Sequence, residues 1–214
     1  MVLLNAASSL KIAQDFNIET REVTLIGEAY FDVSHNKDKP FKVITEDFDI
    51  NVLGTTFNVK VYPGEATSEA TLINGLIQME GKGAKASSIT LKPSQKVIFH
   101  KVVETVQDRK VIKPSLLQPE ISINHYTKVK DSSIVEMAWT QNRLEILDQD
   151  FTEIKTVLER WYDVEIVFAN PELEKYRFTA TFNDENIDQV LSALQKAEHF
   201  KYEIKGKKIT ISKE

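Results

Sequence analysis

The side chains that most often perform chemistry in proteins are either missing from this sequence or spaced too far apart to act together. No histidine has a carboxylate or a second histidine at the spacing of a metal site. The chain also contains no cysteine, which removes thiolate nucleophiles, disulfides and cysteine-ligated metals together. We therefore predict no metal and no cofactor. The histidines are His35, His100, His125 and His199.

Glycines and carboxylates show no catalytic pattern either. None of the seven glycines belongs to a phosphate-binding loop, a dinucleotide fingerprint or a nucleophile elbow. The carboxylates follow the spacing of solvated helix faces and not that of a facing acid and base pair. The sequence therefore predicts a protein that is not an enzyme acting on a separate substrate.

Aromatic side chains could instead form a platform for a sugar or a siderophore. Trp161 lies on a helical apolar stripe and Phe57 has the inward parity of a strand, so core packing is favoured for these two. Tyr30 and Trp139 leave both interpretations open. The full set that could line such a platform is Phe16, Tyr30, Phe57, Trp139, Trp161 and Tyr162.

Composition restricts the class of partner. The 214 residues include 27 Lys and Arg against 32 Asp and Glu, a net charge of −5, so the basic field that attracts nucleic acid is missing. No apolar run has the length of a membrane helix, and the first residues lack the features of a signal peptide. Because residues 2–4 read as the end of a strand, we expect a soluble piece of a longer protein.

Residues 21–100 alternate with a period of two, which is typical of half-buried strands. The parity of the apolar residues reverses between Val52 and Phe57. A one-residue slip turns every side chain to the opposite face, so we predict a β-bulge at Gly54. We expect an all-β domain over residues 1–103, built of twisted or stacked strands, and a connector or edge strands over residues 104–138.

A second pattern in this region is a short sequence motif that recurs 48 residues later. The spacing apolar-x-Gly-x-apolar recurs around Gly27 and Gly75. Asn74-Gly75 alone would indicate a hairpin, but the parity continues without a break to Met79. We therefore predict one continuous strand over residues 73–79, followed by strands at residues 88–91 and 96–99.

The period becomes helical towards the C-terminus. Asp150 and Glu153 predict a capping box that opens an amphipathic helix, and a second helical stripe begins at Ile187. The apolar positions of the two helices and their flanking strands match at a constant offset of 36 residues. We predict a small two-helix α/β domain of duplicated strand-helix-strand units over residues 139–214. The predicted fold class is therefore α+β.

Several motifs resemble the periplasmic part of FecR-type anti-sigma factors, and the resemblance covers nearly the whole chain. In the first domain they are Leu4-Asn5-Ala6-Ala7-Ser8-Ser9-Leu10, Gly27-Glu28-Ala29-Tyr30-Phe31-Asp32-Val33, Pro40-Phe41-Lys42-Val43, Val52-Leu53-Gly54-Thr55-Thr56-Phe57-Asn58-Val59 and Leu91-Lys92-Pro93-Ser94-Gln95-Lys96-Val97. In the second they are Leu158-Glu159-Arg160-Trp161-Tyr162-Asp163-Val164 and Phe178-Thr179-Ala180-Thr181-Phe182.

The resemblance implies a regulator of cell-surface signalling that crosses the inner membrane once. It implies a periplasmic region that senses the signalling domain of a TonB-dependent outer-membrane receptor. It also implies that an N-terminal segment preceding these residues holds an extracytoplasmic-function sigma factor and so regulates transcription. Periplasmic and intramembrane proteases are further implied partners. The implied fold is a solenoid-like twisted sheet followed by a domain similar to the short N-terminal domain of secretins and TonB-dependent receptors.

The resemblance also implies one chemical hypothesis. Some members of this family cleave themselves at a Gly-Thr bond, through attack of the threonine hydroxyl on the preceding carbonyl. Gly54 and Thr55 match that motif, but the sequence identifies neither a base nor an oxyanion donor. The structural alternative is a simple bulge. The candidate motif residues are Gly27, Glu28, Ala29, Tyr30, Phe31, Leu53, Gly54, Thr55 and Phe57.

Three functions therefore remain open. The first is the sensor region of an anti-sigma factor. The second is a periplasmic glycan- or siderophore-binding module, and the third is an autoprocessing domain. For the sensor, pairing of a partner strand with an exposed edge is a plausible recognition mode. The candidate edges are the terminal strand over residues 208–212 and the strands near the connector.

Overall fold

The computed structural model describes residues 1–18, 20–82, 88–101, 120–129 and 133–214. The chain divides into two units, residues 1–137 and 138–214, each with its own hydrophobic core. The first unit is built of strands and the second combines helices with short strands, so the fold is α+β. None of the helices in the described ranges is long and apolar enough to span a membrane.

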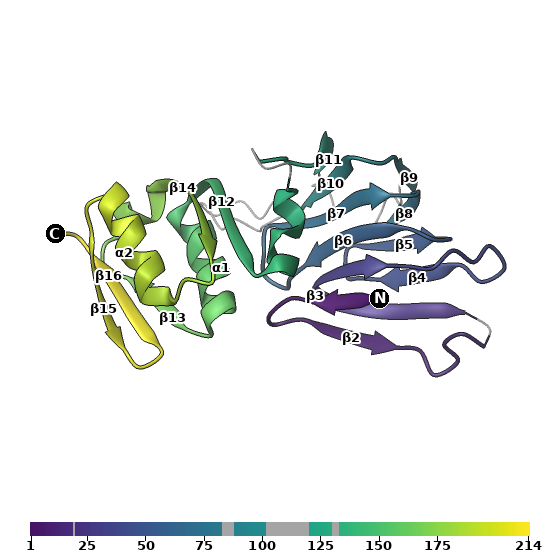
Figure 1. Cartoon of the computed structure of the whole chain (residues 1–214), viewed down its shortest axis with the longest axis horizontal. Helices are drawn as coiled ribbons and strands as arrows, with labels where there is room; N and C mark the ends of the chain where they lie inside the picture. Colours follow the sequence, from purple (N-terminus) through teal and green to yellow (C-terminus); the bar gives the residue numbers. More distant parts are fainter. Residues whose placement is uncertain (19, 83–87, 102–119, 130–132) are drawn as a thin grey trace, which may run out of the picture. The chain divides into compact units, whose positions relative to one another are not determined.

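The strands of the first unit form one curled sheet (Figure 1). Its path runs β11-β10-β7-β6-β3-β4-β5-β8-β9, and β1 and β2 both pair with β3. The strands are β1 (Val2–Leu4), β2 (Ser9–Ile12), β3 (Arg21–Asp32), β4 (Phe41–Ile44), β5 (Phe48–Val52), β6 (Thr56–Val61), β7 (Thr67–Asn74), β8 (Ile77–Gly81), β9 (Ser88–Leu91), β10 (Gln95–His100) and β11 (Glu120–His125).

The sheet curls because β3 belongs to two layers. Its first half pairs with β2 and β4, and its second half pairs with β1 and β6. The change of partners occurs at Gly27, whose φ is +97°. The two layers enclose a common core: the ring centroid of Phe48 on β5 lies 4.8 Å from that of Phe99 on β10.

The period-two pattern is confirmed, but the predicted bulge is not. On β3 the odd-numbered residues from Arg21 to Phe31 are buried, as expected. Residues 53–55, however, join β5 in one layer to β6 in the other. The apolar parity reverses there because two different strands each turn their own face towards the shared core. The register shift in this region lies between β6 and β7 instead, at Thr56 and Phe57.

The predicted continuous strand over residues 73–79 is also wrong. β7 ends at Asn74 and β8 begins at Ile77, and the two strands pair with different partners. Gly75 has a φ of +97°, the same value as Gly27. The motif that recurs around Gly27 and Gly75 therefore marks two places where the chain passes from one layer to the other.

The connector predicted over residues 104–138 falls partly outside the described residues, since 102–119 and 130–132 are not described. Within the described part, residues 120–125 form β11, which pairs antiparallel with β10 at one end of the sheet path. The strands predicted at residues 88–91 and 96–99 are present as β9 and β10.

Two small sheets support the second unit (Figure 1). β12 pairs with β14, and β16 lies between β13 and β15. A 3₁₀-helix, η2 (Val135–Gln141), leads into this unit. The elements that follow are β12 (Arg143–Asp150), α1 (Phe151–Tyr162), β13 (Glu165–Phe168), η3 (Pro171–Lys175), β14 (Arg177–Asn183), α2 (Ile187–Ala197), β15 (Lys201–Lys205) and β16 (Lys208–Ser212).

Both α-helices begin with a capping box. The backbone N–H of Glu153 donates to Oδ1 of Asp150 at 2.9 Å, and the Asp150 N–H donates to Oε2 of Glu153 at 3.3 Å. This confirms the predicted start of α1. Asn186 and Gln189 form the same arrangement at the start of α2, a cap that the sequence analysis did not identify.

Topology does not confirm the duplicated strand-helix-strand description. The two strands that flank each helix belong to different sheets, and β16 lies outside both proposed repeats. This arrangement also corrects the expected partner edge over residues 208–212. Because β16 is hydrogen-bonded on both sides, by β13 and β15, it has no edge on which to accept a further strand.

Candidate ligand pocket at the layer-crossing turns

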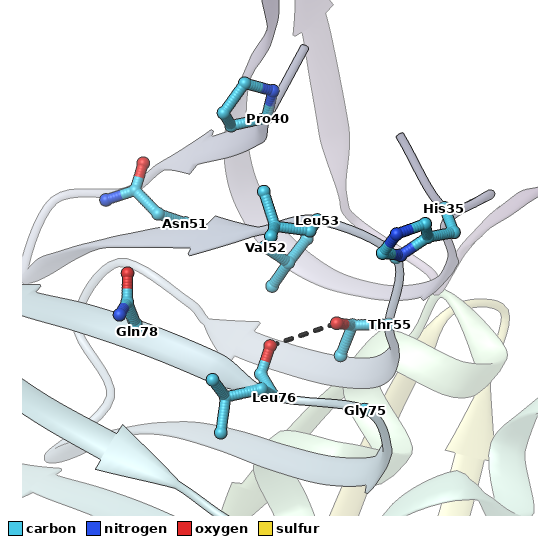
Figure 2. A pocket seen from close by; sticks show the side chains of 10 residues that line it. His35, Pro40, Asn51, Val52, Leu53, Thr55, Gly75, Leu76 and Gln78 are labelled. Atoms are coloured by element: carbon cyan, nitrogen blue, oxygen red, sulfur yellow. Dashed lines mark hydrogen bonds between the residues drawn. The ribbon is translucent and has the colours of Figure 1, made fainter. Parts of the chain in front are cut away.

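Two turns that carry the chain between the layers lie side by side in the first unit. One, residues 53–55, joins β5 to β6, and the other, residues 74–76, joins β7 to β8. The Thr55 hydroxyl donates to the backbone carbonyl of Leu76 at 3.0 Å (Figure 2). Thr55 also exchanges two backbone hydrogen bonds with Val33, of 3.2 and 3.0 Å. Thr55 therefore connects its own turn to Leu76 in the second turn and to Val33 directly after β3.

Each turn contains a glycine because neighbouring backbone atoms approach it too closely for a side chain. A Cβ atom at Gly54 would lie 2.4 Å from the Cα of His35, and one at Gly75 would lie 2.9 Å from the carbonyl oxygen of Gly54. Gly75 also needs its positive φ, which L-residues rarely adopt. Gly54 does not have a positive φ. A glycine is required at this position because a Cβ atom would clash with His35 in the 34–39 segment, and not because of backbone strain.

Arg21 holds the 34–39 segment in place through hydrogen bonds to its backbone. Its guanidinium donates to four backbone carbonyls: Lys39 at 2.7 Å, Ser34 at 3.0 Å, and Asn36 and Leu53 at 3.4 Å each. Burial lowers the pKa of Arg21, yet the group remains a cation because the ordinary value lies far above 7. It therefore acts as a rigid multiple donor that fixes the 34–39 segment against the first turn.

A cavity of about 540 Å³ opens between these turns and the outer side of β5 and β8 (Figure 2). Its walls are largely apolar, and no Asp, Glu, Lys or Arg is among the described residues that line it. Volumes of roughly 300 to 1,000 Å³ are typical of small-ligand sites. The lining residues are His35, Pro40, Asn51, Val52, Leu53, Gly54, Thr55, Gly75, Leu76 and Gln78.

Polar groups enter the cavity from two neighbouring strands. Asn51 on β5 and Gln78 on β8 are directly opposed in the antiparallel register, so both side chains point to the same face. Neither side-chain amide has a hydrogen-bond partner among the described residues. Two exposed leucines border the same space, Leu53 at 45% and Leu76 at 49% exposure.

The structure brings only some of the candidate motif residues to this pocket. Leu53, Gly54 and Thr55 line it, whereas the β3 motif lies elsewhere. Gly27 marks the layer change, and Tyr30 is half-buried. The remaining apolar members are fully buried in the core: Ala29, Phe31 and Phe57.

Glu28 has a different environment. Its carboxylate accepts from the side-chain amide of Asn5 at 2.7 Å and from that of Asn58 at 2.8 Å, and the residue is only 7% exposed. The Asn5 backbone N–H also donates to the Glu28 carbonyl. Glu28 therefore fastens the turn between β1 and β2 to the second half of β3, which is a structural role.

The aromatic residues considered as a platform do not line the pocket. Phe16 packs edge-on against Phe41, with ring centroids 6.4 Å apart. Tyr30 belongs to the first unit, where burial and then the charge of Asp32 raise its pKa. Trp139 and Trp161 belong to the second. Stacking on these rings therefore has no support at the cavity.

Self-cleavage at Gly54-Thr55 stays a hypothesis, because only the detection of the two fragments can show it. The attacking atom would be the Thr55 hydroxyl, which here donates to Leu76. Among the described residues, we find no side chain that donates to the Gly54 carbonyl; the guanidinium of Arg21 donates to the carbonyl of the neighbouring Leu53. No group of three or more potential metal ligands occurs in the described ranges.

Sequence reasoning missed much of the pocket. Arg21 carried a usable signal, because it is a charged residue at an inward-facing, odd-numbered position of β3. His35, Leu76 and Gln78 carried none, since their meeting with residues 53–55 depends on how the layers fold.

Two protein-family models match the chain. The model described as FecR protein matches residues 1–78, and the model described as FecR, C-terminal, matches residues 143–211. Comparison with curated protein sequences finds no significant match.

Two crystal structures share the fold over 100% of this chain, and each is described as a "putative anti-sigma factor" from Parabacteroides distasonis ATCC 8503. The structure at 1.65 Å has a TM-score of 0.77 and 25% identity over 90% of its own chain. The structure at 2.50 Å has a TM-score of 0.78 and 24% identity over 89% of its own chain. One family model matches within each unit, and the shared fold extends over both, so the chain belongs to the FecR family of anti-sigma factors.

Proposed function

We propose that this chain is the signal-receiving periplasmic region of an anti-sigma factor anchored in the inner membrane. In this proposal it binds the periplasmic signalling domain of a TonB-dependent outer-membrane receptor. The binding controls an extracytoplasmic-function sigma factor held by a cytoplasmic segment of the same protein. The observation that carries the proposal is the pair of family matches, one in each unit.

The proposal assigns the chain a binding role without turnover of a substrate. Two features support it. The short sheets of the second unit leave edge strands whose backbone groups can pair with a partner. One of these, β14, has no charged residue from Phe178 to Asn183, so it lacks the lysine or glutamate that commonly protects an edge.

Calorimetric titration with the receptor's signalling domain tests the proposal. The domain should come from the TonB-dependent receptor encoded beside this protein, and the sample should first be checked for intact mass. We expect saturable one-to-one binding. A signalling domain from an unrelated receptor serves as the control and should bind at least about tenfold more weakly, a difference of roughly 1.4 kcal/mol.

Absence of binding by a folded, uncleaved sample would contradict the sensor function. A direct interaction of the same sample with a glycan or a ferric chelate, with a dissociation constant in the micromolar range, would instead favour a ligand-binding module.

A further inference from the structure

We propose that the cavity between the two layer-crossing turns binds an apolar side chain presented by an uncharged, extended peptide segment of the partner protein. This inference rests on the proposed sensor function and gives it a specific site. The site consists of Leu53 and Leu76 at the border, the amides of Asn51 and Gln78, and the floor formed by Thr55.

The described residues that line the cavity include no Asp, Glu, Lys or Arg, although these four residue types make up 28% of the chain. A buried charge without a partner is costly, and none of the described lining residues is an acidic or basic residue that could pair with a lysine, a carboxylate or a charged iron chelate. The cavity therefore selects an uncharged occupant.

The side-chain amides of Asn51 and Gln78 give the cavity groups that can bind a peptide backbone. A side-chain amide presents a carbonyl and an NH₂ group side by side, which complements the C=O and N–H of a peptide group. Asn51 and Gln78 lie opposite one another on adjacent strands, and neither side-chain amide has a hydrogen-bond partner among the described residues. They can therefore bond the backbone of an extended segment that crosses β5 and β8.

Two exposed leucines lie at the border of the cavity. The side chains of Leu53 and Leu76 expose apolar surface to solvent at the border of the cavity. Leu53 precedes Gly54 and Leu76 follows Gly75, the two glycines that allow the turns to approach closely. An apolar side chain that enters the cavity would cover both leucines and remove their surface from water. A peptide supplies this side chain and the backbone groups for the amides at the same time.

The pocket can be tested directly with blocked tripeptides. The probes are N-acetyl-Gly-Leu-Gly-amide, the matching lysine peptide and the matching glutamate peptide, titrated into ¹⁵N- and ¹³C-labelled chain. We expect the leucine peptide to shift the side-chain amide signals of Asn51 and Gln78 and the methyl signals of Leu53 and Leu76, with a dissociation constant near 1 mM. The charged peptides should bind roughly tenfold more weakly.

A charge placed in the cavity should reverse this preference. In Gln78→Glu we expect the lysine peptide to bind more tightly than the leucine peptide. Unchanged ranking of the three peptides, or no shift at any of the four residues, would overturn the inference. Tighter binding of a neutral sugar such as maltose than of the leucine peptide would overturn it too, by assigning the cavity to a carbohydrate.

Partner binding is then compared between matched variants. The double variant Leu53→Thr/Leu76→Thr should bind the receptor's signalling domain roughly tenfold more weakly than the parent chain. Ile26→Thr is the control, because Ile26 is 51% exposed in the same unit but does not line the cavity. Far-UV circular dichroism and the thermal midpoint establish that the variants remain folded.

The outcomes separate the two proposals. If the parent chain binds the signalling domain and the double variant binds equally well, the sensor function stands and the pocket inference is wrong. If the parent chain does not bind the domain, the sensor function fails, and the tripeptide titration still reports on the pocket by itself.

Discussion

The hydroxyl of Thr55 donates a 3.0 Å hydrogen bond to the backbone carbonyl of Leu76, and this contact joins two turns that are 21 residues apart in the sequence. Both turns move the chain from one layer of the sheet to the other. Thr55 is only 3% exposed, so its hydroxyl is shielded from water and would lack a partner without this bond. The same hydroxyl is the atom on which the self-cleavage hypothesis depends.

We expect Thr55→Val to destabilise the first unit by about 1.5 kcal/mol. The change keeps the shape of the side chain but leaves the Leu76 carbonyl without its donor. Urea unfolding followed by circular dichroism measures the loss. Thr56→Val is a suitable control, since the Thr56 hydroxyl makes a longer, exposed bond of 3.3 Å to Asp32 and its loss should matter less.

Intact mass of the parent chain addresses cleavage separately. Because the hydroxyl is engaged with Leu76 and the Gly54 carbonyl lacks a side-chain donor in the described part of the chain, we expect a single mass of 24.4 kDa after prolonged native incubation. Two fragments divided between Gly54 and Thr55, and absent from Thr55→Val, would show that the chain cleaves itself.

Gly75→Ala should be strongly destabilising. The new Cβ would lie 2.8 Å from the Thr55 hydroxyl and 2.9 Å from the Gly54 carbonyl, at a φ of +97°. We expect a loss of about 3 kcal/mol in the free energy of unfolding. Gly64→Ala is the matched control: its φ is +79° but its Cβ meets no atom within 4 Å, so only the backbone cost of about 1 kcal/mol should remain.

Equal losses in the two glycine variants would contradict the close packing of the turns. Chemical shifts of residues 53–55 in Gly75→Ala give a second reading, since the first turn must move to make room for the methyl group.

Arg21→Met should destabilise the first unit by about 3 kcal/mol, because four backbone carbonyls lose their donor at once. Arg21→Lys should recover only part of this, since an ammonium cannot reproduce the planar fork. Lys213→Met, which removes an exposed ion pair with Glu172, should leave the unfolding midpoint unchanged.

Tryptophan fluorescence shows whether Arg21→Met destabilises the first unit alone or both units. Both tryptophans lie in residues 138–214, so their emission follows the second unit, whereas circular dichroism follows both units. A shift in the fluorescence transition as large as that in circular dichroism would contradict the placement of the Arg21 effect in the first unit alone.

Acid should weaken the first unit through Asp49. Burial by itself raises the pKa of Asp49, but the ammonium groups of Lys82 at 2.8 Å and Lys42 at 3.1 Å outweigh burial and hold the pKa below its ordinary value. A lowered folded-state pKa contributes stability above the unfolded-state pKa of about 3.9. That stability is lost as the pH falls through the folded-state value.

Asp49→Asn should therefore be less stable than the parent chain at pH 7, and the difference should shrink below about pH 4. Urea midpoints measured from pH 7 down to about pH 2 give this comparison. A difference that stays constant over the whole range would show that Asp49 does not titrate with a lowered pKa.

Local patterns in the sequence determined much of the fold. Alternation with a period of two located the strands of the first unit, because a half-buried strand must turn every second side chain to the core. Asp150 and Glu153 located the start of α1, because their capping bonds close over only three residues. These features could be predicted because their causes lie within a few residues of one another.

Only the tertiary structure decided how the strands pair and what the pocket contains. The reversed parity between β5 and β6 is compatible with a bulge or with two separate strands, and pairing partners far along the chain make the choice. Position 75 must be a glycine because a Cβ atom there would clash with Gly54 and Thr55, and a local sequence pattern does not reveal this contact. The pocket arises where Arg21 draws the 34–39 segment onto these turns, so its residues come together only after the layers have folded.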